Sequence, residues 1–317
     1  MIARELIPVP QYAGEVERGL TSSPKSLPTK LFYDAAGSEL FEAITGLPEY
    51  YPTRTEFAIL EEHASEMARL AGTGLAIVEL GAGTAAKTCT LLKAVAARQM
   101  RVDYVPVDIS RAAVREARDR VRAAVPQSYV RPIIADFSEG FDFLSSISGR
   151  RLVLYLGSSI GNFDPQAAIE MLGRVRNQLT QGEALLLGTD LVKSAKILVP
   201  AYADAQGITA AFNKNILSRL NRELDANFAL DSFHHIACWN RSASRMEMHL
   251  ESARAQTVDL KLIQLSVEFA PGERIHTENS YKYTIAMVRE MLSASGFSLE
   301  RTWFDHQRWF ALHLARV

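Results

Sequence analysis

The sequence has few cysteines, almost no net charge and no long uninterrupted apolar run. Cys89 and Cys238 stand far apart and form no cluster with metal-ligand spacing, which argues against a disulfide framework and a zinc site. A net charge of −1 over 317 residues leaves no electrostatic footprint for nucleic acid or an anionic membrane. The apolar runs are too short to span a bilayer, and the opening MIARELIPVPQYAG lacks the apolar core of a signal peptide. We expect a cytoplasmic, globular monomer.

Short apolar runs alternate with amphipathic helical stretches in the first half of the chain. GLAIVELGAG, VDYVPVDIS, YVRPIIADF, RRLVLYLGSS and GEALLLGTD are the runs, and helical sequences such as RAAVREARDRVRAAV separate them. This pattern is typical of βαβ units, in which helices cover both faces of a parallel sheet. It predicts an α/β fold with a doubly wound, Rossmann-like sheet.

The alternation of apolar runs and helical stretches stops at about residue 194, and the sequence pattern beyond it is first helical and then extended. The stretch RMEMHLES places Met246, Met248 and Leu250 on one face of a predicted strand and polar residues on the other. The length of the chain also favours a core with an insertion. We expect an N-terminal helical segment over 1–72 that contributes to the substrate lobe, a core over 73–193, an inserted α+β substrate-binding lobe over 194–282, and a C-terminal helix with two closing strands over 283–317.

The stretch LGAGTAAKT, residues 80–88, predicts a strand-to-helix turn where backbone can approach a ligand. It nearly matches the phosphate loop of ATP-binding proteins, but Ala86 stands where the second glycine is required. It also fits a dinucleotide site, with Gly81 and Gly83 in the turn and Asp108 placed to hold a ribose.

A third ligand, S-adenosylmethionine, fits this turn best. Glu79, just before the turn, would repel a pyrophosphate but suits the cationic methionine end of this cofactor. The Asp136–Phe137 pair after the next run offers an adenine contact and an aromatic face. Two closing strands at the C-terminus also suit a methyltransferase sheet. The sequence therefore favours S-adenosylmethionine over ATP and NAD, and we expect no metal.

Five stretches of the chain form distinctive motifs: LFYDAAGSELFEAITGLPEYYPTRTE (31–56), ELGAGTAAKT, YVPVDIS, YLGSSIGNF (155–163) and IHTENSYKY (275–283). These stretches resemble the histidine-specific Nα-methyltransferases of the ergothioneine pathway. The similarity runs from about residue 20 to the C-terminus, and the first motif is long and distinctive. The resemblance implies trimethylation of the α-amino group of free L-histidine to hercynine, with S-adenosylmethionine as the methyl donor.

The resemblance also implies the residues that hold the substrate and the donor. Asn162 and Tyr202 would bind the α-carboxylate, and Gly157 would line the floor near the amine. The aromatic wall would be Tyr33, Phe41 and Tyr50, and the candidates for a catalytic role are Tyr33, Asn162 and Tyr202. The donor would be held by Gly81, Gly83, Lys87, Asp108, Asp136 and Phe137.

The stretch RIHTENSYKYT, residues 274–284, would read the imidazole. The resemblance implies that Glu278 and Ser280 hydrogen-bond the two ring nitrogens and that Met248 packs on the ring. A carboxylate and a hydroxyl suit a ring that donates from one nitrogen and accepts at the other. Strand periodicity places His276 and Lys282 on the same face. Alternating charges more often mark a solvated strand face, so the alternative that Glu278 is a surface residue stays open.

Two other functions also stay open from the residues. One keeps the chemistry but changes the substrate to another aromatic amino acid such as tryptophan. The other is a non-catalytic protein that binds S-adenosylmethionine, which would leave Asn162, Tyr202 and Glu278 unexplained.

Overall fold

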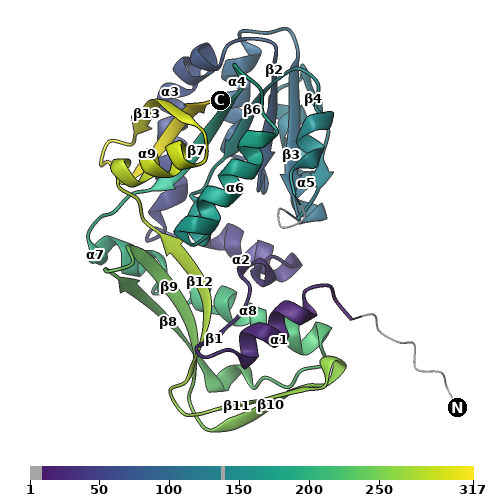
Figure 1. The fold of residues 1–317 in the computed structure, drawn as a ribbon, viewed down its shortest axis with the longest axis vertical. Coiled ribbons are helices and arrows are strands. Elements are labelled where there is room, and N and C mark those ends of the chain that lie inside the picture. Colours follow the sequence, from purple (N-terminus) through teal and green to yellow (C-terminus); the bar gives the residue numbers. More distant parts are fainter. Residues whose placement is uncertain (1–8, 137–139) are drawn as a thin grey trace, which may run out of the picture. The chain divides into compact units, whose positions relative to one another are not determined.

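The computed structural model describes residues 9–136 and 140–317, and the chain forms two compact units (Figure 1). The first unit consists of the chain up to Glu49 together with Ala195–Asn240 and Met246–Glu278. The second consists of Tyr50–Ser194, Arg241–Arg245 and Asn279–Val317. No helix in the part of the chain so described is long and apolar enough to cross a membrane.

The second unit is built on an eight-stranded sheet of order β13-β14-β7-β6-β2-β3-β4, in which β5 also pairs with β3 (Figure 1). The ladders among β2 to β7 are parallel, whereas β14 is antiparallel to both β7 and β13. This confirms the predicted doubly wound sheet and its two closing strands. The strands are β2 Leu75–Leu80, β3 Val102–Asp108, β4 Ser128–Val130, β5 Ile133–Ile134, β6 Arg150–Tyr155, β7 Ala184–Asp190, β13 Ser298–Phe304 and β14 Phe310–Arg316.

Helices cover both faces of this sheet, as the alternating sequence predicts. Every residue of β2 is buried, because side chains on both of its faces meet helices. One apolar cluster joins the sheet to α3 Tyr51–Ala71, α4 Thr88–Ala96 and α5 Arg111–Ala124. A second cluster joins the opposite face to α6 Pro165–Asn177 and α9 Ile285–Ala294.

The first unit contains a four-stranded sheet of order β1-β12-β9-β8 and a separate hairpin of β10 and β11. In β9 the buried residues alternate and include Met246, Met248 and Leu250, which confirms the predicted inward face. Its strands are β1 Lys25–Ser26, β8 Phe233–Asn240, β9 Arg245–Ser252, β10 Gln256–Leu260, β11 Leu265–Phe269 and β12 Arg274–Tyr281. Its helices are α1 Ala13–Thr21, α2 Ala35–Thr45, α7 Ala195–Leu198 and α8 Ile208–Glu223.

Short 3-10 turns connect these elements: η1 Thr29–Phe32, η2 Asp142–Ser146, η3 Ser159–Asn162, η4 Val199–Ala201, η5 Leu230–Ser232 and η6 Lys261–Ile263. The units divide the N-terminal region between Glu49 and Tyr50, whereas the sequence pattern placed a boundary at residue 72. The reason is that α3 packs on α4 and on β14, so it belongs to the second unit.

Candidate functional site

The glycine turn lies at the carboxyl end of β2, the edge where open α/β sheets bind ligands. Gly81 and Gly83 have φ angles of 67° and 51°, a left-handed conformation that glycine adopts without strain. The amides of Gly81 and Ala82 donate to the Val107 carbonyl at 2.8 and 3.1 Å, which fixes the turn against β3. A Cβ built on either glycine would meet no atom within 4 Å, so the turn leaves open space for a ligand.

Asp108 ends β3 and is bonded directly to this turn. Its Oδ2 accepts from the amide of Gly83 at 3.0 Å, and its Oδ1 accepts from the amide of Ser110 at 2.9 Å. Burial raises the pKa of the Asp108 carboxyl, and these backbone donors act against that rise. A carboxylate offers about four acceptor positions, so two amides leave capacity for ligand hydroxyls. The turn and Asp108 together fit a ribose-bearing cofactor.

Lys87 and Gly157 come together around a residue that the sequence did not single out. Glu56, in the first turns of α3, is completely buried and forms an ion pair with Lys87. Its Oε1 accepts from the amide of Gly157 at 2.8 Å. Gly157 follows β6 and has a φ of 73°, and a Cβ there would lie 3.8 Å from Lys87 Nζ. Glu56 therefore holds the lysine of the glycine turn beside the loop after β6.

Glu79 lies near the end of β2, just before the turn, and its buried carboxylate accepts hydrogen bonds from two hydroxyl groups of the same unit. It accepts from the Thr88 hydroxyl at 2.6 Å and from the Tyr104 hydroxyl. Burial raises the pKa of the Glu79 carboxyl to about 7, although both hydroxyls act to lower it. These contacts fasten β2 to β3 and to the start of α4, in addition to any effect that the charge has on a cationic ligand.

Asn162 is the last residue of η3 and is half-buried. The turn before it is packed tightly, because a Cβ at Gly161 would lie 2.9 Å from the carbonyl oxygen of Tyr281. The Tyr281 hydroxyl donates to Asp164 Oδ1 at 2.9 Å, on the other side of Asn162. Tyr281, the residue after Ser280, thus contacts the chain on both sides of Asn162 and holds the turn in place.

Ser280 belongs to a buried charged network. Lys282 Nζ donates to the Ser280 hydroxyl oxygen at 2.8 Å and lies 2.8 Å from Asp190 Oδ2 at the end of β7. Asp190 also accepts from the Tyr51 hydroxyl at 2.6 Å and pairs with Lys193. Burial alone would raise the pKa of the Asp190 carboxyl, but the ammonium groups of Lys282 and Lys193 outweigh it and hold that pKa below its usual value. Burial also lowers the pKa of Lys193 to about 8, against the attraction of Asp190.

Lys282 follows β12 directly and does not lie on a solvated strand face. Its side chain is buried rather than solvated, and Ser280 and Tyr281 are buried as well. Strand alternation therefore ends at Glu278, and the four consecutive residues from Ser280 to Tyr283 are buried. The cause is the buried carboxylate of Asp190, which provides a partner for the lysine charge.

In the first unit, Tyr33 and Phe41 are brought together by the start of α2. Asp34 caps the helix by accepting from the Gly37 amide at 2.7 Å, and it also pairs with Arg222 of α8 at 2.7 Å. A Cβ at Gly37 would lie 1.7 Å from a preceding backbone oxygen, which explains the glycine in FYDAAGS. The rings of Tyr33 and Phe41 then meet edge to face, with centroids 6.0 Å apart.

The other first-unit candidates lie on or beside the four-stranded sheet. Tyr202 is buried, and its carbonyl oxygen lies 2.8 Å from Nε2 of His235. Met248 is 2% exposed and belongs to the apolar core. Glu278 is half-buried near the end of β12, and its backbone oxygen lies 3.0 Å from Nε2 of His276.

The candidate residues thus divide between the units. The second unit contains the cofactor candidates Gly81, Gly83, Lys87, Asp108 and Asp136, and the substrate candidates Tyr50, Gly157, Asn162 and Ser280. The first unit contains Tyr33, Phe41, Tyr202, Met248 and Glu278. Phe137 lies outside the described residues. In the second unit, Asp108 is bonded to the glycine turn, and Lys87 and Gly157 both contact Glu56.

Comparison with known proteins gives consistent matches along the chain. A family model described as "Histidine-specific methyltransferase, SAM-dependent" matches residues 12–317. The histidine N-alpha-methyltransferase of Mycolicibacterium smegmatis is 44% identical over 301 residues, covering 95% of this chain and 93% of that protein. The protein of the same name from Mycobacterium tuberculosis is 41% identical over 301 residues with the same coverage. Ergothioneine biosynthesis protein 1 of Neurospora crassa is 31% identical over 300 residues, which are 92% of this chain but 33% of that protein.

Proposed function

Because the chain belongs to the family of histidine-specific, S-adenosylmethionine-dependent methyltransferases, we propose that it trimethylates the α-amino group of free L-histidine to hercynine in ergothioneine biosynthesis. The observation that carries this proposal is the family match over residues 12–317, which spans both units. The names of the two mycobacterial relatives, which are similar to this chain over 95% of its length, support the same reaction.

The cofactor side is assigned to the second unit. Gly81 and Gly83 would lie against the donor, and Asp108 would accept hydrogen bonds from ribose hydroxyls while it holds the Gly83 amide. Lys87, oriented by Glu56, would face the negative carboxylate of the methionine part. Asp136 would contact the adenine. When bound, S-adenosylmethionine supplies an electrophilic methyl group on a sulfonium.

The α-carboxylate of histidine is assigned to Asn162 and Tyr202. An amide N–H and a phenol O–H can each donate to a carboxylate, and neither adds a charge that the bound amino acid would have to balance. The turn around Asn162 is fixed on both sides by Tyr281 contacts, which favours a preset orientation. A ligand without the carboxylate would leave these donors unpaired.

The amine has to be neutral to act as a nucleophile. An α-amine with a pKa of about 8 or somewhat higher loses its proton at modest cost near neutral pH. We assign Gly157 to the floor near this amine, and Tyr33, Phe41 and Tyr50 to an aromatic wall with Tyr33 in a catalytic role. Aromatic rings limit water near the reacting nitrogen, which favours loss of the sulfonium charge in the transition state.

The imidazole is assigned to Glu278 and Ser280, with Met248 packed on the ring. Lys282 can only donate, so the Ser280 oxygen acts as the acceptor in their 2.8 Å contact. The proton of the Ser280 hydroxyl is then the group that it can present to a ring nitrogen lone pair. Glu278 would accept from the other ring N–H, so this pair selects the neutral imidazole.

One assay separates this function from the alternatives. Labelled methyl transfer from S-adenosylmethionine to a panel of free amino acids should give signal with histidine far above tryptophan, tyrosine and phenylalanine. Higher transfer to tryptophan than to histidine would make tryptophan the substrate. Binding of S-adenosylmethionine without methyl transfer to any of these amino acids would indicate a non-catalytic protein. Mass spectrometry of the histidine product should show three added methyl groups.

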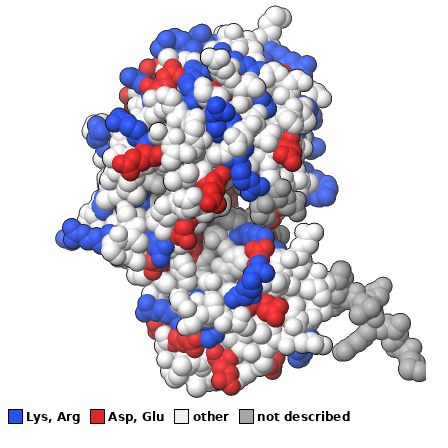
Figure 2. Space-filling view, viewed as in Figure 1, with Lys and Arg blue, Asp and Glu red and all other residues white. Residues whose placement is uncertain are grey.

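We also propose that the protein works as a cytoplasmic monomer with no nucleic-acid partner. Figure 2 shows Lys and Arg side chains interspersed with Asp and Glu over the visible face, without a broad area of one sign. The net charge of −1 supports the same conclusion. Size-exclusion chromatography with light scattering should give a mass near 35.1 kDa.

A further inference from the structure

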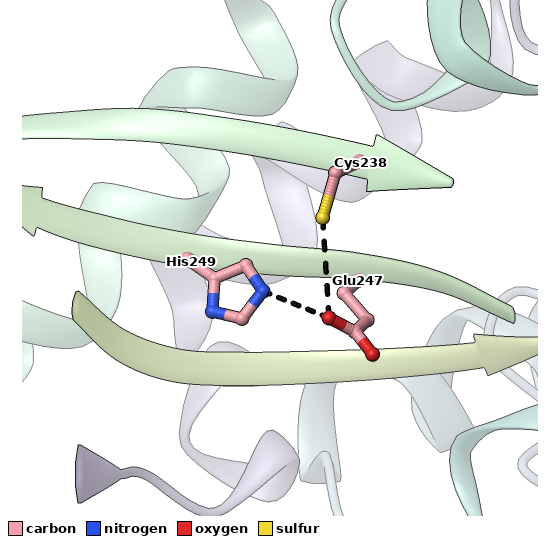
Figure 3. Close-up of side chains that lie close together, drawn as sticks. All are labelled: Cys238, Glu247 and His249. Carbon is pink, nitrogen blue, oxygen red and sulfur yellow. Dashed lines mark hydrogen bonds and ion pairs between the residues drawn. The ribbon is translucent and has the colours of Figure 1, made fainter. Parts of the chain in front are cut away.

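Three side chains on neighbouring strands of the first unit point toward one another (Figure 3). Cys238 comes from β8, and Glu247 and His249 come from β9. The Cys238 Sγ lies 3.9 Å from Glu247 Oε2, and His249 Nε2 lies 3.2 Å from the same oxygen. One ligand atom from each of the three lies within 4.8 Å of the others.

The carboxylate at the centre of this group is enclosed and oriented. The side chains of Glu247 and His249 are each 13% exposed, so the group is not a solvated surface cluster. Asn240 donates to Glu247 Oε1 at 2.9 Å, which turns Oε2 toward the sulfur and the imidazole. This is the supporting arrangement that protein metal sites use, in which a second residue fixes the orientation of a ligand.

The distances match those of a small tetrahedral ion. With bonds of about 2.0 Å to nitrogen and oxygen and about 2.3 Å to sulfur, tetrahedral nitrogen and oxygen ligands lie roughly 3.3 Å apart, and a sulfur lies roughly 3.5 Å from either. The measured nitrogen–oxygen separation of 3.2 Å fits this geometry, and the sulfur–oxygen separation of 3.9 Å would have to shorten by a few tenths of an ångström. A thiolate with an imidazole and a carboxylate selects zinc-like ions, since magnesium and calcium prefer oxygen ligands alone.

We propose that Cys238, Glu247 and His249 form a three-ligand site for a divalent transition-metal ion such as Zn²⁺, with the fourth position open to water or another small ligand. Binding would release the thiol proton of Cys238 to solvent, and the thiolate and carboxylate would together balance the charge of the ion. The ion would link β8 to β9. Alternation in RMEMHLES places Glu247 and His249 on one strand face, but Cys238 joins them only through the pairing of β8 with β9, so the site could not be predicted from the sequence.

Cobalt titration tests the site without reference to enzyme activity. Addition of Co²⁺ alone to the reduced, metal-free full chain should produce the near-ultraviolet charge-transfer band of a cobalt–thiolate bond at one ion per chain, and Zn²⁺ should remove it. Cys238→Ser should abolish the band. His249→Gln and Glu247→Gln should each weaken binding by about 100-fold or more, and Asn240→Ala by about 10-fold.

The matched controls are Cys89→Ser and His234→Gln, which change the same residue types outside the cluster and should leave the titration unchanged. Circular dichroism checks that each variant is folded, and if Cys238→Ser does not fold, His249→Gln decides the outcome. Absence of the band at saturating Co²⁺ in the wild type would overturn the proposal. So would a band that survives in Cys238→Ser, or one that His249→Gln leaves at full affinity.

Discussion

Replacement of Lys282 by methionine tests the buried network behind Ser280. Methionine keeps an unbranched apolar side chain but removes the ammonium group that contacts Asp190 and Ser280 at 2.8 Å each. The side chains of Lys282 and Asp190 are each 1% exposed, so neither charge is hydrated in the folded protein. The substitution leaves Asp190 with Tyr51 and Lys193 as its remaining partners.

The expected loss of stability follows from two opposing terms. At 2.8 Å and an effective dielectric constant of about 20, the Coulomb attraction between Lys282 and Asp190 is about 6 kcal/mol. The cost of burying the ammonium group offsets several kcal/mol of this, while the carboxylate stays buried after the substitution. Removal of one partner of a buried pair typically costs about 3 to 5 kcal/mol. Because Lys193 still balances Asp190, we expect a loss near the lower end, about 3 kcal/mol.

Urea unfolding followed by tryptophan fluorescence measures this loss, since Trp303 and Trp309 belong to the second unit. Lys261→Met is the matched control, because its ion pair with Asp225 spans 4.0 Å between exposed side chains and should be worth less than about 1 kcal/mol. Equal effects of the two substitutions would refute the reasoning. The stabilisation from Asp190 should be present above the pKa of an unfolded aspartate, about 3.9, and be lost as the pH falls through its lower folded pKa.

Four further substitutions test the assigned roles. Asp108→Ala should weaken binding of S-adenosylmethionine by about 1 to 3 kcal/mol, because charge-assisted hydrogen bonds to the ribose are lost. Calorimetry measures this change, and an unchanged affinity would show that Asp108 does not bind the cofactor. Asn162→Ala and Tyr202→Phe should each raise the KM for histidine while cofactor affinity stays constant, and histamine should be a poor substrate of the wild type; efficient methylation of histamine would contradict both roles. Glu278→Ala should lower kcat/KM for histidine by a factor that corresponds to about 2 to 4 kcal/mol, and it should raise the ratio of kcat/KM for tryptophan to that for histidine. Glu268→Ala, at an exposed position, should change neither quantity.

The core sheet could be predicted from the sequence because its signal is local. A strand buried on both faces reads as a continuous apolar run, and LAIVEL and ALLLGTD show this without any knowledge of their neighbours. The run YVRPIIADF was less simple. It splits into β4 and β5 around Pro132, which has no amide hydrogen to give to the ladder of β3.

The residues that support the site could not be predicted in the same way. Glu56 lies 31 positions before Lys87, and no spacing rule links a helix residue to a glycine turn in that manner. Its burial and its contact with Gly157 depend on how α3 packs against the sheet, which only the folded unit determines. Nothing in the local sequence YYPTRTE distinguishes Glu56 from an exposed helix residue, although it is completely enclosed.

The strand RIHTENSYKYT shows where the period-two rule stops. It holds in β12 up to Glu278, where Ile275 and Thr277 are buried and the residues between them are not. Beyond that point the chain pairs with the end of β7, since the Tyr283 amide donates to the Asp190 carbonyl at 2.9 Å. Lys282 is then enclosed beside the Asp190 carboxylate, 92 positions earlier in the chain. Alternation describes a strand with one solvated face, so a charge beyond that strand is placed by its partner and not by its position in the pattern.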